Sequence, residues 1–218
     1  MQDWAAANDV TLPTATSTWQ RLEVNPPNIH SGHDEIVWAL EHRAGRVFSA
    51  SADKTVRVWC PHEKRCLHVL EGHSRPVLSL ASTQDALFSG SYDNSVRVWQ
   101  LGSLQCRHVL EGHTDAVRAL TTVGSFLFSG SYDHTVRAWH LPDSSGAADG
   151  SGSAGAYKCA AVLEKHKGPV RALTGLQNLV FSGSYDETVC CWDAQVCFDT
   201  RFGAHFQRSA EQPDHNAP

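Results

Sequence analysis

The sequence predicts an all-β protein made of repeated four-stranded units, and three observations lead to this prediction. A forty-residue pattern, seen most clearly at residues 71–110, recurs along the chain. Each copy has a histidine near its start and a tryptophan near its end. Between these markers, short apolar runs alternate with turn-forming residues. Repeats of this length, which bury their faces against neighbouring repeats, are typical of the blades of a β-propeller.

The repeats divide the chain into three parts. Residues 31–202 form the repeat region, with copies at 31–70, 71–110, 111–163 and 164–202. Residues 1–30 keep Trp19 at the expected spacing but carry Pro26 and Pro27, and proline does not donate to a strand ladder. We interpret this segment as a degenerate N-terminal half-blade. Residues 203–218 are a polar C-terminal tail.

Four strands are predicted within each copy, and the second copy shows their positions. The strands span 77–81, 86–91, 95–100 and 105–110, and turn residues separate them at 84–85, 93–94 and 102–103. The second and third strands carry bulky apolar residues on both faces, as expected of a sheet covered on both sides. The third copy has thirteen extra residues at 144–156, whose Gly, Ser and Ala composition predicts a flexible surface loop.

The number of repeats determines whether the blades can close into the ring of a complete propeller. Four copies and a half are fewer than most propellers of this kind contain, and an open arc would expose two apolar sheet faces. The sequence therefore predicts an incomplete propeller with a fragment-like origin. The alternatives are a small ring of four or five blades and a ring completed by self-association with a second chain.

Composition narrows the classes of function. The net charge is −5, and the absence of a basic run makes nucleic acid an unexpected partner. The apolar runs are strand-sized and the N-terminus lacks the pattern of a signal peptide, so no membrane contact is expected. An odd number of cysteines, seven, suits a reducing compartment, and we predict a cytoplasmic or nuclear protein.

The four in-register copies carry recurring motifs, including Ser91-Tyr92-Asp93 and a final Trp192-Asp193. With these motifs, residues 31–202 resemble the WD40-repeat family. The wording of the repeats, with LEGH, LFSGSYD and VRVW, is most similar to propellers attached to CCCH zinc fingers or to RING/TRAF-type ubiquitin ligases. The chain contains neither a CCCH nor a RING cysteine pattern.

The resemblance implies a buried hydrogen-bond network in each blade, formed by a histidine, a serine, an aspartate and a tryptophan. Such a network gives the buried indole N–H an acceptor and fixes the histidine tautomer. The same residue types make a hydrolase triad, but identical sets in four successive repeats favour a structural role. We therefore predict no catalytic residue and no enzyme activity. The implied sets are His33, Ser51, Asp53 and Trp59; His73, Ser91, Asp93 and Trp99; His113, Ser131, Asp133 and Trp139; and His166, Ser184, Asp186 and Trp192.

The resemblance also implies that partners bind the rim formed by the loops before the first strands and the turns after the second strands. A tyrosine precedes the turn aspartate in three copies, and tyrosine is enriched among interface hot spots. Packing against the adjacent blade is the alternative role for these tyrosines. Charged residues from the same loops and strand starts complete the candidate protein-binding set, which is Tyr92, Tyr132, Tyr185, Arg75, Asp115, Lys167, Arg118 and Arg171.

Two further patterns are given no functional role. Cys66 with His68, and Cys106 with His108, provide metal-ligand types, but only one pair per blade, whereas structural zinc needs four gathered ligands. We predict no metal and no cofactor. The third strands carry arginines at positions 57, 97 and 137. We expect the aliphatic part of each side chain to lie over apolar surface and its guanidinium group to be solvated.

The function predicted from the sequence is that of a non-catalytic protein–protein interaction scaffold or adaptor that binds proteins or peptides. Recruitment of substrates in a multiprotein complex, such as a ubiquitin ligase complex, is the finer form of this hypothesis. The alternatives are a severed regulatory portion of a kinase or ligase polypeptide and an RNA-associated repeat protein. The charge balance argues against RNA.

Overall fold

The computed structural model describes residues 32–142 and 157–194. The predicted half-blade at 1–30, the insertion at 144–156, the end of the fourth copy at 195–202 and the tail at 203–218 lie outside the described residues. Within the described ranges no helix is long and apolar enough to cross a membrane. All regular structure there is β, which confirms the predicted fold class.

The strands form four antiparallel sheets in the order of the sequence, and each sheet is one blade. Blade 1 contains β1 (Val37–Arg43), β2 (Arg46–Ser51), β3 (Val56–Cys60) and β4 (Arg65–Leu70). Blade 2 contains β5 (Val77–Ser82), β6 (Ala86–Ser91), β7 (Val96–Gln100) and β8 (Cys106–Leu110). Blade 3 contains β9 (Val117–Val123), β10 (Phe126–Ser131), β11 (Val136–His140) and β12 (Cys159–Leu163). Blade 4 has three described strands, β13 (Val170–Leu176), β14 (Leu179–Ser184) and β15 (Val189–Asp193).

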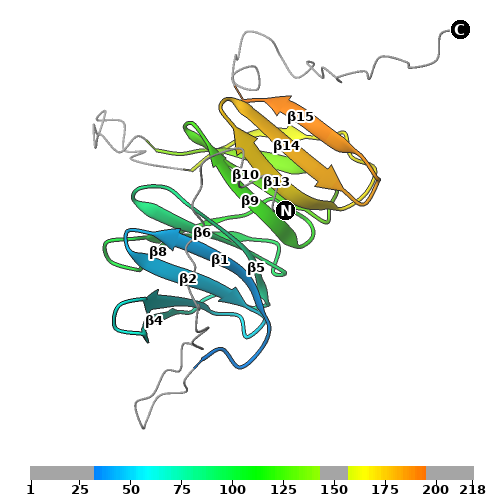
Figure 1. Cartoon of the computed structure of the whole chain (residues 1–218). Helices are drawn as coiled ribbons and strands as arrows, with labels where there is room; N and C mark the ends of the chain where they lie inside the picture. Colours follow the sequence, from blue (N-terminus) through cyan, green and yellow to red (C-terminus); the bar gives the residue numbers. More distant parts are fainter. Residues whose placement is uncertain (1–31, 143–156, 195–218) are drawn as a thin grey trace, which may run out of the picture.

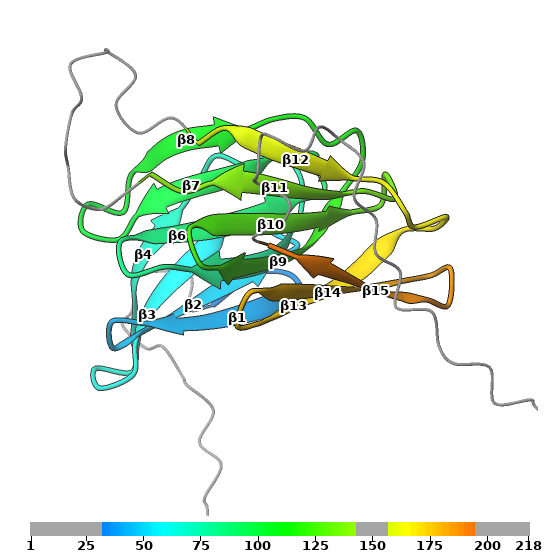
Figure 2. The same ribbon diagram turned by 90° about the horizontal axis from the view of Figure 1, so that it is seen from above.

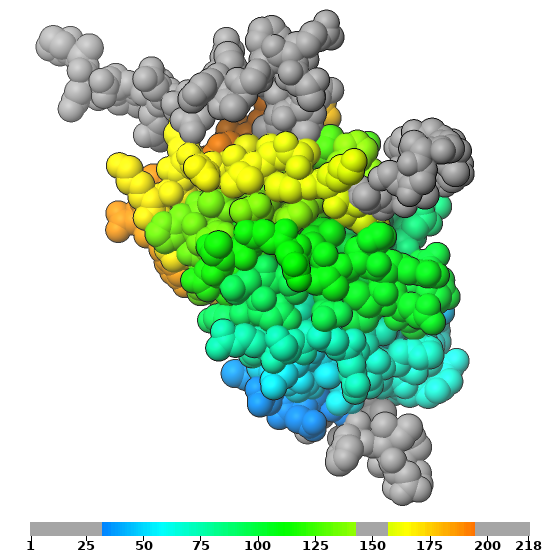
Figure 3. Space-filling model, turned by 180° about the vertical axis from the view of Figure 1, so that it is seen from behind, coloured from blue at the N-terminus to red at the C-terminus, as the bar shows by residue number. Residues whose placement is uncertain are grey.

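The blades pack face to face along an arc, each against the next one in the chain (Figures 1 and 3). Their first strands, β1, β5, β9 and β13, contact one another in sequence and form the inner wall of the arc. In blade 3, β9 lies at one edge of the sheet and β12 at the other (Figure 2). The hydrophobic core is therefore divided into three layers, one at each junction between blades.

A β-bulge near the start of each inner strand is repeated in all four blades. In blade 3, Val117 pairs with Ser131 and Ala119 pairs with Gly130, so that Arg118 has no partner in the ladder. The residues at the same position in the other blades are Trp38, Leu78 and Arg171. A bulge bends the strand and re-aims a side chain. This irregularity determines how the inner wall ends at the rim.

Candidate functional site

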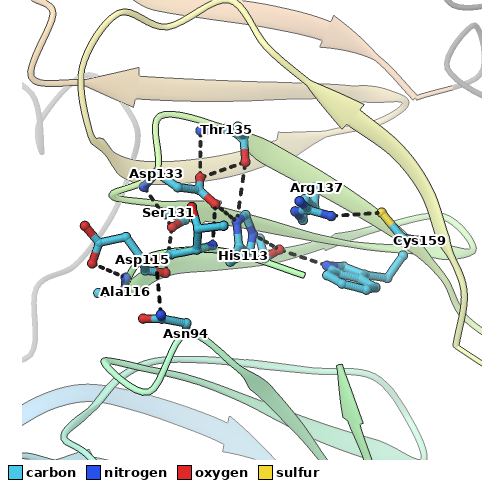
Figure 4. A network of polar contacts seen from close by, with 12 residues as sticks. Asn94, His113, Asp115, Ala116, Ser131, Asp133, Thr135, Arg137 and Cys159 are labelled. Atoms are coloured by element: carbon cyan, nitrogen blue, oxygen red, sulfur yellow. Dashed lines mark hydrogen bonds and ion pairs between the residues drawn. The ribbon is translucent and has the colours of Figure 1, made fainter. Parts of the chain in front are cut away.

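A chain of hydrogen bonds links a tryptophan, a serine, a histidine and an aspartate in each blade, and blade 3 shows it most clearly (Figure 4). The Trp139 indole N–H donates to Ser129 Oγ at 2.8 Å, and Ser129 Oγ is 2.8 Å from His113 Nε2. His113 Nδ1 lies 2.7 Å from Asp133 Oδ2. One tautomer satisfies all of these contacts, with Nδ1–H donating to the carboxylate and the serine hydroxyl donating to Nε2.

In each blade, the serine that accepts the indole N–H lies two residues earlier in the sequence than predicted. The predicted Ser51, Ser91, Ser131 and Ser184 are wrong for this role, which belongs to Ser49, Ser89, Ser129 and Ser182. The reason is geometric, because Trp139 pairs with Leu127 and reaches only its diagonal neighbour on β10. A serine two residues further along the strand is too far away.

The predicted serines have another task, which is to join two loops. Ser131 Oγ accepts the N–H of Asp133 at 3.0 Å and donates to the carbonyl of Asp115 at 2.8 Å. Asp133 Oδ2 also accepts the N–H of Thr114 at 3.1 Å. The loop before β9 and the turn after β10 are thereby held against each other, and the other three blades repeat these bonds.

Sequence reasoning missed one member of the network. Thr135 donates both its N–H and its hydroxyl to Asp133 Oδ1, at 2.9 and 2.7 Å. The equivalent residues are Thr55, Ser95 and Thr188. A Ser or Thr two residues after each turn aspartate was the available signal, since such residues favour local turns of this type.

The network sets the charge state of its aspartates. Burial raises the pKa of Asp133, but hydrogen bonds from His113 and Thr135 outweigh it and hold the pKa well below its usual value. The pKa values of Asp93 and Asp186 are lowered in the same way, against burial, by hydrogen bonds that include those from His73 and Thr188 respectively. These carboxylates are therefore ionised at neutral pH and serve as permanent acceptors.

The order of groups matches that of a hydrolase triad, but the geometry does not allow its chemistry. Ser89, Ser129 and Ser182 are 0% exposed, and each hydroxyl oxygen accepts an indole N–H. A substrate carbonyl has no path to these oxygens. We call each set of tryptophan, serine, histidine and aspartate a staple, because its hydrogen bonds hold the rim loops of one blade in place.

The rim carries a row of three tyrosines, Tyr92, Tyr132 and Tyr185, one from each of blades 2, 3 and 4. The ring centroids of Tyr92 and Tyr132 are 6.3 Å apart, and those of Tyr132 and Tyr185 are also 6.3 Å apart. Tyr92 is 36% exposed and Tyr185 is 61% exposed. The tyrosines thus contact one another across the blade junctions and still present surface to solvent. We call them the tyrosine row.

Two arginines from the bulge positions lie beside the tyrosine row. Arg171 hydrogen-bonds Tyr185, which lowers the pKa of that phenol, and Arg118 hydrogen-bonds Tyr132. Arg118 also donates to the carbonyl of Leu78 at 3.1 Å, and its Cζ lies 5.5 Å from the ring centroid of Trp38. Sequence reasoning missed Trp38, although its position one residue into β1 matches that of the arginines.

The remaining predicted binding residues lie in the loops that precede the inner strands. Arg75, Asp115 and Lys167 are all exposed. Arg75 and Asp115 are at equivalent positions, whereas Lys167 is one residue earlier in its repeat and matches Thr114. The Lys167 N–H donates to Asp186 Oδ2 at 2.8 Å, which fixes its backbone while the side chain stays at the surface. The predicted set therefore lies on one rim, with the tyrosine row and two arginines on its inner side.

The arginines of the third strands are not solvated as expected. A Cβ added to Gly72 would come 2.7 Å from Arg97 Nη1, and one added to Gly112 would come 2.7 Å from Arg137 Nη1. The two glycines have φ values of 146° and 149°, which side chains rarely adopt. Each guanidinium thus packs beneath a glycine loop, with its Nε buried. Blade 4 has Lys165 in place of the glycine and Cys190 in place of the arginine.

The cysteines of the outer strands bond within their own strands. The thiols of Cys66 and Cys106 donate to the carbonyls of His68 and His108 at 3.3 and 3.5 Å. Among the residues at 32–142 and 157–194, no group of three or more His, Cys, Asp or Glu side chains is arranged to hold a metal ion.

Comparison with known proteins gives a family model and several solved structures. The family model described as "WD domain, G-beta repeat" matches residues 25–60, 64–100, 104–140 and 157–193. A search of curated proteins found no match. Among solved structures, the chain is 27% identical to U3-55K and 28% identical to the WD40 repeats of RRP9, each with a TM-score of 0.64.

A computationally designed protein, Ika4, is also similar, with 30% identity and a TM-score of 0.60. All three alignments cover 74% of this chain. They extend over 93% of Ika4 but only 50% of U3-55K and 49% of the RRP9 chain. The chain therefore spans about half the length of the first two solved proteins.

Proposed function

The chain belongs to the WD40 repeat family, and we propose that it is a non-catalytic protein-interaction scaffold that binds partners at the rim carrying the tyrosine row. One observation carries this proposal. Three tyrosines contact one another in sequence, stay partly exposed, and have two guanidinium groups beside them. The staples hold the supporting loops, so the surface is formed before a partner arrives.

The chemistry of this rim favours an acidic peptide or an acidic protein loop. Arg118 and Arg171 gather positive charge on the inner wall of a chain whose net charge is −5. Guanidinium groups bind carboxylates through two parallel hydrogen bonds, and tyrosines add apolar contact area with little loss of conformational freedom. An extended segment with carboxylates near the arginines and apolar side chains over the tyrosine row would use both features.

The assembly in which the scaffold works is a finer proposal. The wording of the repeats supports an adaptor role in a multiprotein complex, with substrate recruitment to a ubiquitin ligase as one such setting. This part rests on the sequence resemblance alone. It would be tested by identifying the protein that binds through the rim.

The test of the binding proposal uses a displayed library of random peptides, panned against the full chain. We expect enrichment of acidic peptides that contain apolar residues, and we expect their affinity, measured by fluorescence anisotropy, to fall as salt is added. The double variant Tyr132→Ala with Arg171→Gln should lose about tenfold or more in affinity, since hot-spot truncations have effects of this size. Thermal unfolding should be unchanged.

The matched control replaces two exposed residues of β8, Arg107→Gln with Val109→Ala, on the outer edge strand of blade 2 and outside the tyrosine row and its arginines. This variant should bind the enriched peptide as the parent chain does. Enrichment without acidic residues, or full affinity in the Tyr132 and Arg171 double variant, would contradict the proposal. If a single-stranded RNA probe bound the parent chain and not the rim variant, the partner of the rim would be RNA, which would also contradict the proposal.

A further inference from the structure

The contact that joins neighbouring blades has two different sides, and it is made three times in this chain. At the junction of blades 2 and 3, one side is formed by strands of blade 3 and the other by strands of blade 2. We call these the plug and the socket. The plug here contains Val117, Leu120, Leu127 and Trp139, and the socket contains Phe88, Val96, Val98 and Leu110.

Blade 1 has a plug without a socket among the described residues. Its plug, at the positions equivalent to those above, consists of Val37, Leu40, Val47 and Trp59. Val37 is 45% exposed, whereas the equivalent Val77, Val117 and Val170 are 0% exposed. Leu40 is 68% exposed, whereas Leu80 and Leu120 are 8% exposed.

Blade 4 has the complementary feature, a socket that no described plug covers. Its socket residues are Phe181, Val189 and Cys191. Val189 is 73% exposed, although the equivalent Val56, Val96 and Val136 are at most 1% exposed. Leu176, at the end of the same face opposite the rim, is 60% exposed, while the equivalent Val123 is 6% exposed.

At two of the three junctions a valine of the plug seats on a glycine of the socket. A Cβ on Gly90 would lie 2.8 Å from Val117 Cγ1, and a Cβ on Gly130 would lie 2.7 Å from Val170 Cγ1. Each valine therefore occupies the space that the missing side chain leaves. At Gly183 the nearest atom to such a Cβ is Ala172 Cβ, at 3.9 Å, and no valine is present. At the junction of blades 1 and 2 the position equivalent to these glycines is Ala50, which lies in the same core layer as Val77. Among the described blades, Val37 is the plug valine with no described blade to pack against, and it is 45% exposed.

We propose that the partner of these two faces is a second copy of this chain, docked head to tail. Val37 of one copy seats on Gly183 of the other, and the same contact forms at the opposite end, so that two arcs close a ring. The same fit is present inside the chain, since two junctions already seat a valine on a glycine and the third packs Val77 in one core layer with Ala50. The alignments extend over 50% and 49% of two solved chains of the same fold, so a pair of arcs supplies about the length of one such chain.

The proposed contact joins unlike surfaces, and that property makes it testable. A head-to-tail interface closes a ring only if its rotation brings the last free face onto the first. A symmetric contact between two plugs would ignore changes in the socket. Variants on the two faces therefore distinguish the proposed arrangement from other dimers.

The experiment measures the mass of the full chain in solution by sedimentation velocity and light scattering. We expect twice the mass of the single chain, which is 23.9 kDa. Val37→Asp and Val189→Asp should each give a monomer, because each places an unpaired carboxylate in an apolar contact. The matched control is Val109→Asp on β8, since Val109 is 42% exposed but lies in neither face, and this variant should stay dimeric.

A mixing experiment separates loss of contact from loss of folding. The Val37→Asp chain keeps an intact socket and the Val189→Asp chain keeps an intact plug, so the mixture should form a heterodimer through one junction. Circular dichroism of each variant checks that the sheets are retained. A folded monomer for the parent chain, open-ended polymers, or a dimer that is unaffected by Val189→Asp would each overturn the proposal.

Discussion

The Ser129 hydroxyl accepts the indole N–H of Trp139 at 2.8 Å, from a position with no solvent exposure. Replacing Ser129 with Ala leaves this N–H and His113 Nε2 without partners. A buried unsatisfied group costs about 1 to 3 kcal/mol, so we expect the free energy of unfolding to fall by about 2 to 4 kcal/mol. Urea unfolding followed by tryptophan fluorescence measures this change, with exposed Ser103→Ala as the control.

Hydrogen exchange of the Trp139 indole proton tests whether Ser129, rather than Ser131, is its acceptor. In Ser129→Ala the Trp139 indole proton should exchange rapidly with solvent in an NMR experiment, because its acceptor is gone. In Ser131→Ala the proton should stay protected, since the Ser131 hydroxyl bonds Asp115 and Asp133 and not the indole. Equal protection in the two variants would mean that the staple does not depend on Ser129.

The ionised aspartates predict how stability responds to acid. The pKa of Asp133 is lower in the folded protein than its ordinary value of 3.8, so the carboxylate stabilises the fold above that value. The contribution is lost as the pH falls toward the folded pKa. We expect Asp133→Asn to be less stable than the parent by a constant amount from about pH 5 to 7, with the difference shrinking below about pH 4.

Urea unfolding of both chains across this pH range makes the measurement. The exposed Asp85→Asn is the matched control, because it leaves the staple intact. A stability difference that grew as the pH fell would show that Asp133 has no depressed pKa in the folded state.

The glycine and arginine of blades 2 and 3 predict a coupling in blade 4. Cys190→Arg places a guanidinium beneath Lys165, whose side chain already occupies part of that space. Overpacking of this kind lowers the free energy of unfolding by about 1 to 3 kcal/mol. Adding Lys165→Gly recreates the pair that Gly112 and Arg137 form, so part of the loss should be recovered. The double-mutant cycle should give a coupling energy of about 0.5 kcal/mol or more.

The cycle needs the free energy of unfolding for the parent, both single variants and the double variant. Lys165→Gly alone serves as the control for the added backbone freedom of glycine. Strict additivity of the two changes would mean that the space beneath the loop is not what links these positions.

The strands are predicted well from the sequence because turn-forming residues separate them clearly. The strand expected at 86–91 is observed as Ala86–Ser91, and that expected at 95–100 is observed as Val96–Gln100. Turn aspartates and glycines recur at fixed intervals, so each boundary is supported by several copies. The period also predicts the stacking of the blades, since a sheet with two apolar faces needs a neighbour on each.

Sequence reasoning fails where distance along a strand decides between equivalent residues. Ser129 and Ser131 lie on the same face of β10, and only the position of Trp139 across the ladder selects one of them. The bulge that directs Arg118 is a change of register, which composition does not reveal. The contact of Arg118 with Trp38 joins blades 1 and 3 and depends on the curvature of the whole arc.

Every staple is completed within a single repeat, as blade 3 shows with His113, Ser129, Asp133 and Trp139. Duplication or deletion of one forty-residue unit in the gene therefore adds or removes a whole staple, one plug and one socket together. No half-finished polar network is left behind in the protein. Such a gene can change its number of blades by single recombination events, and each product inherits the same rules for joining one blade to the next.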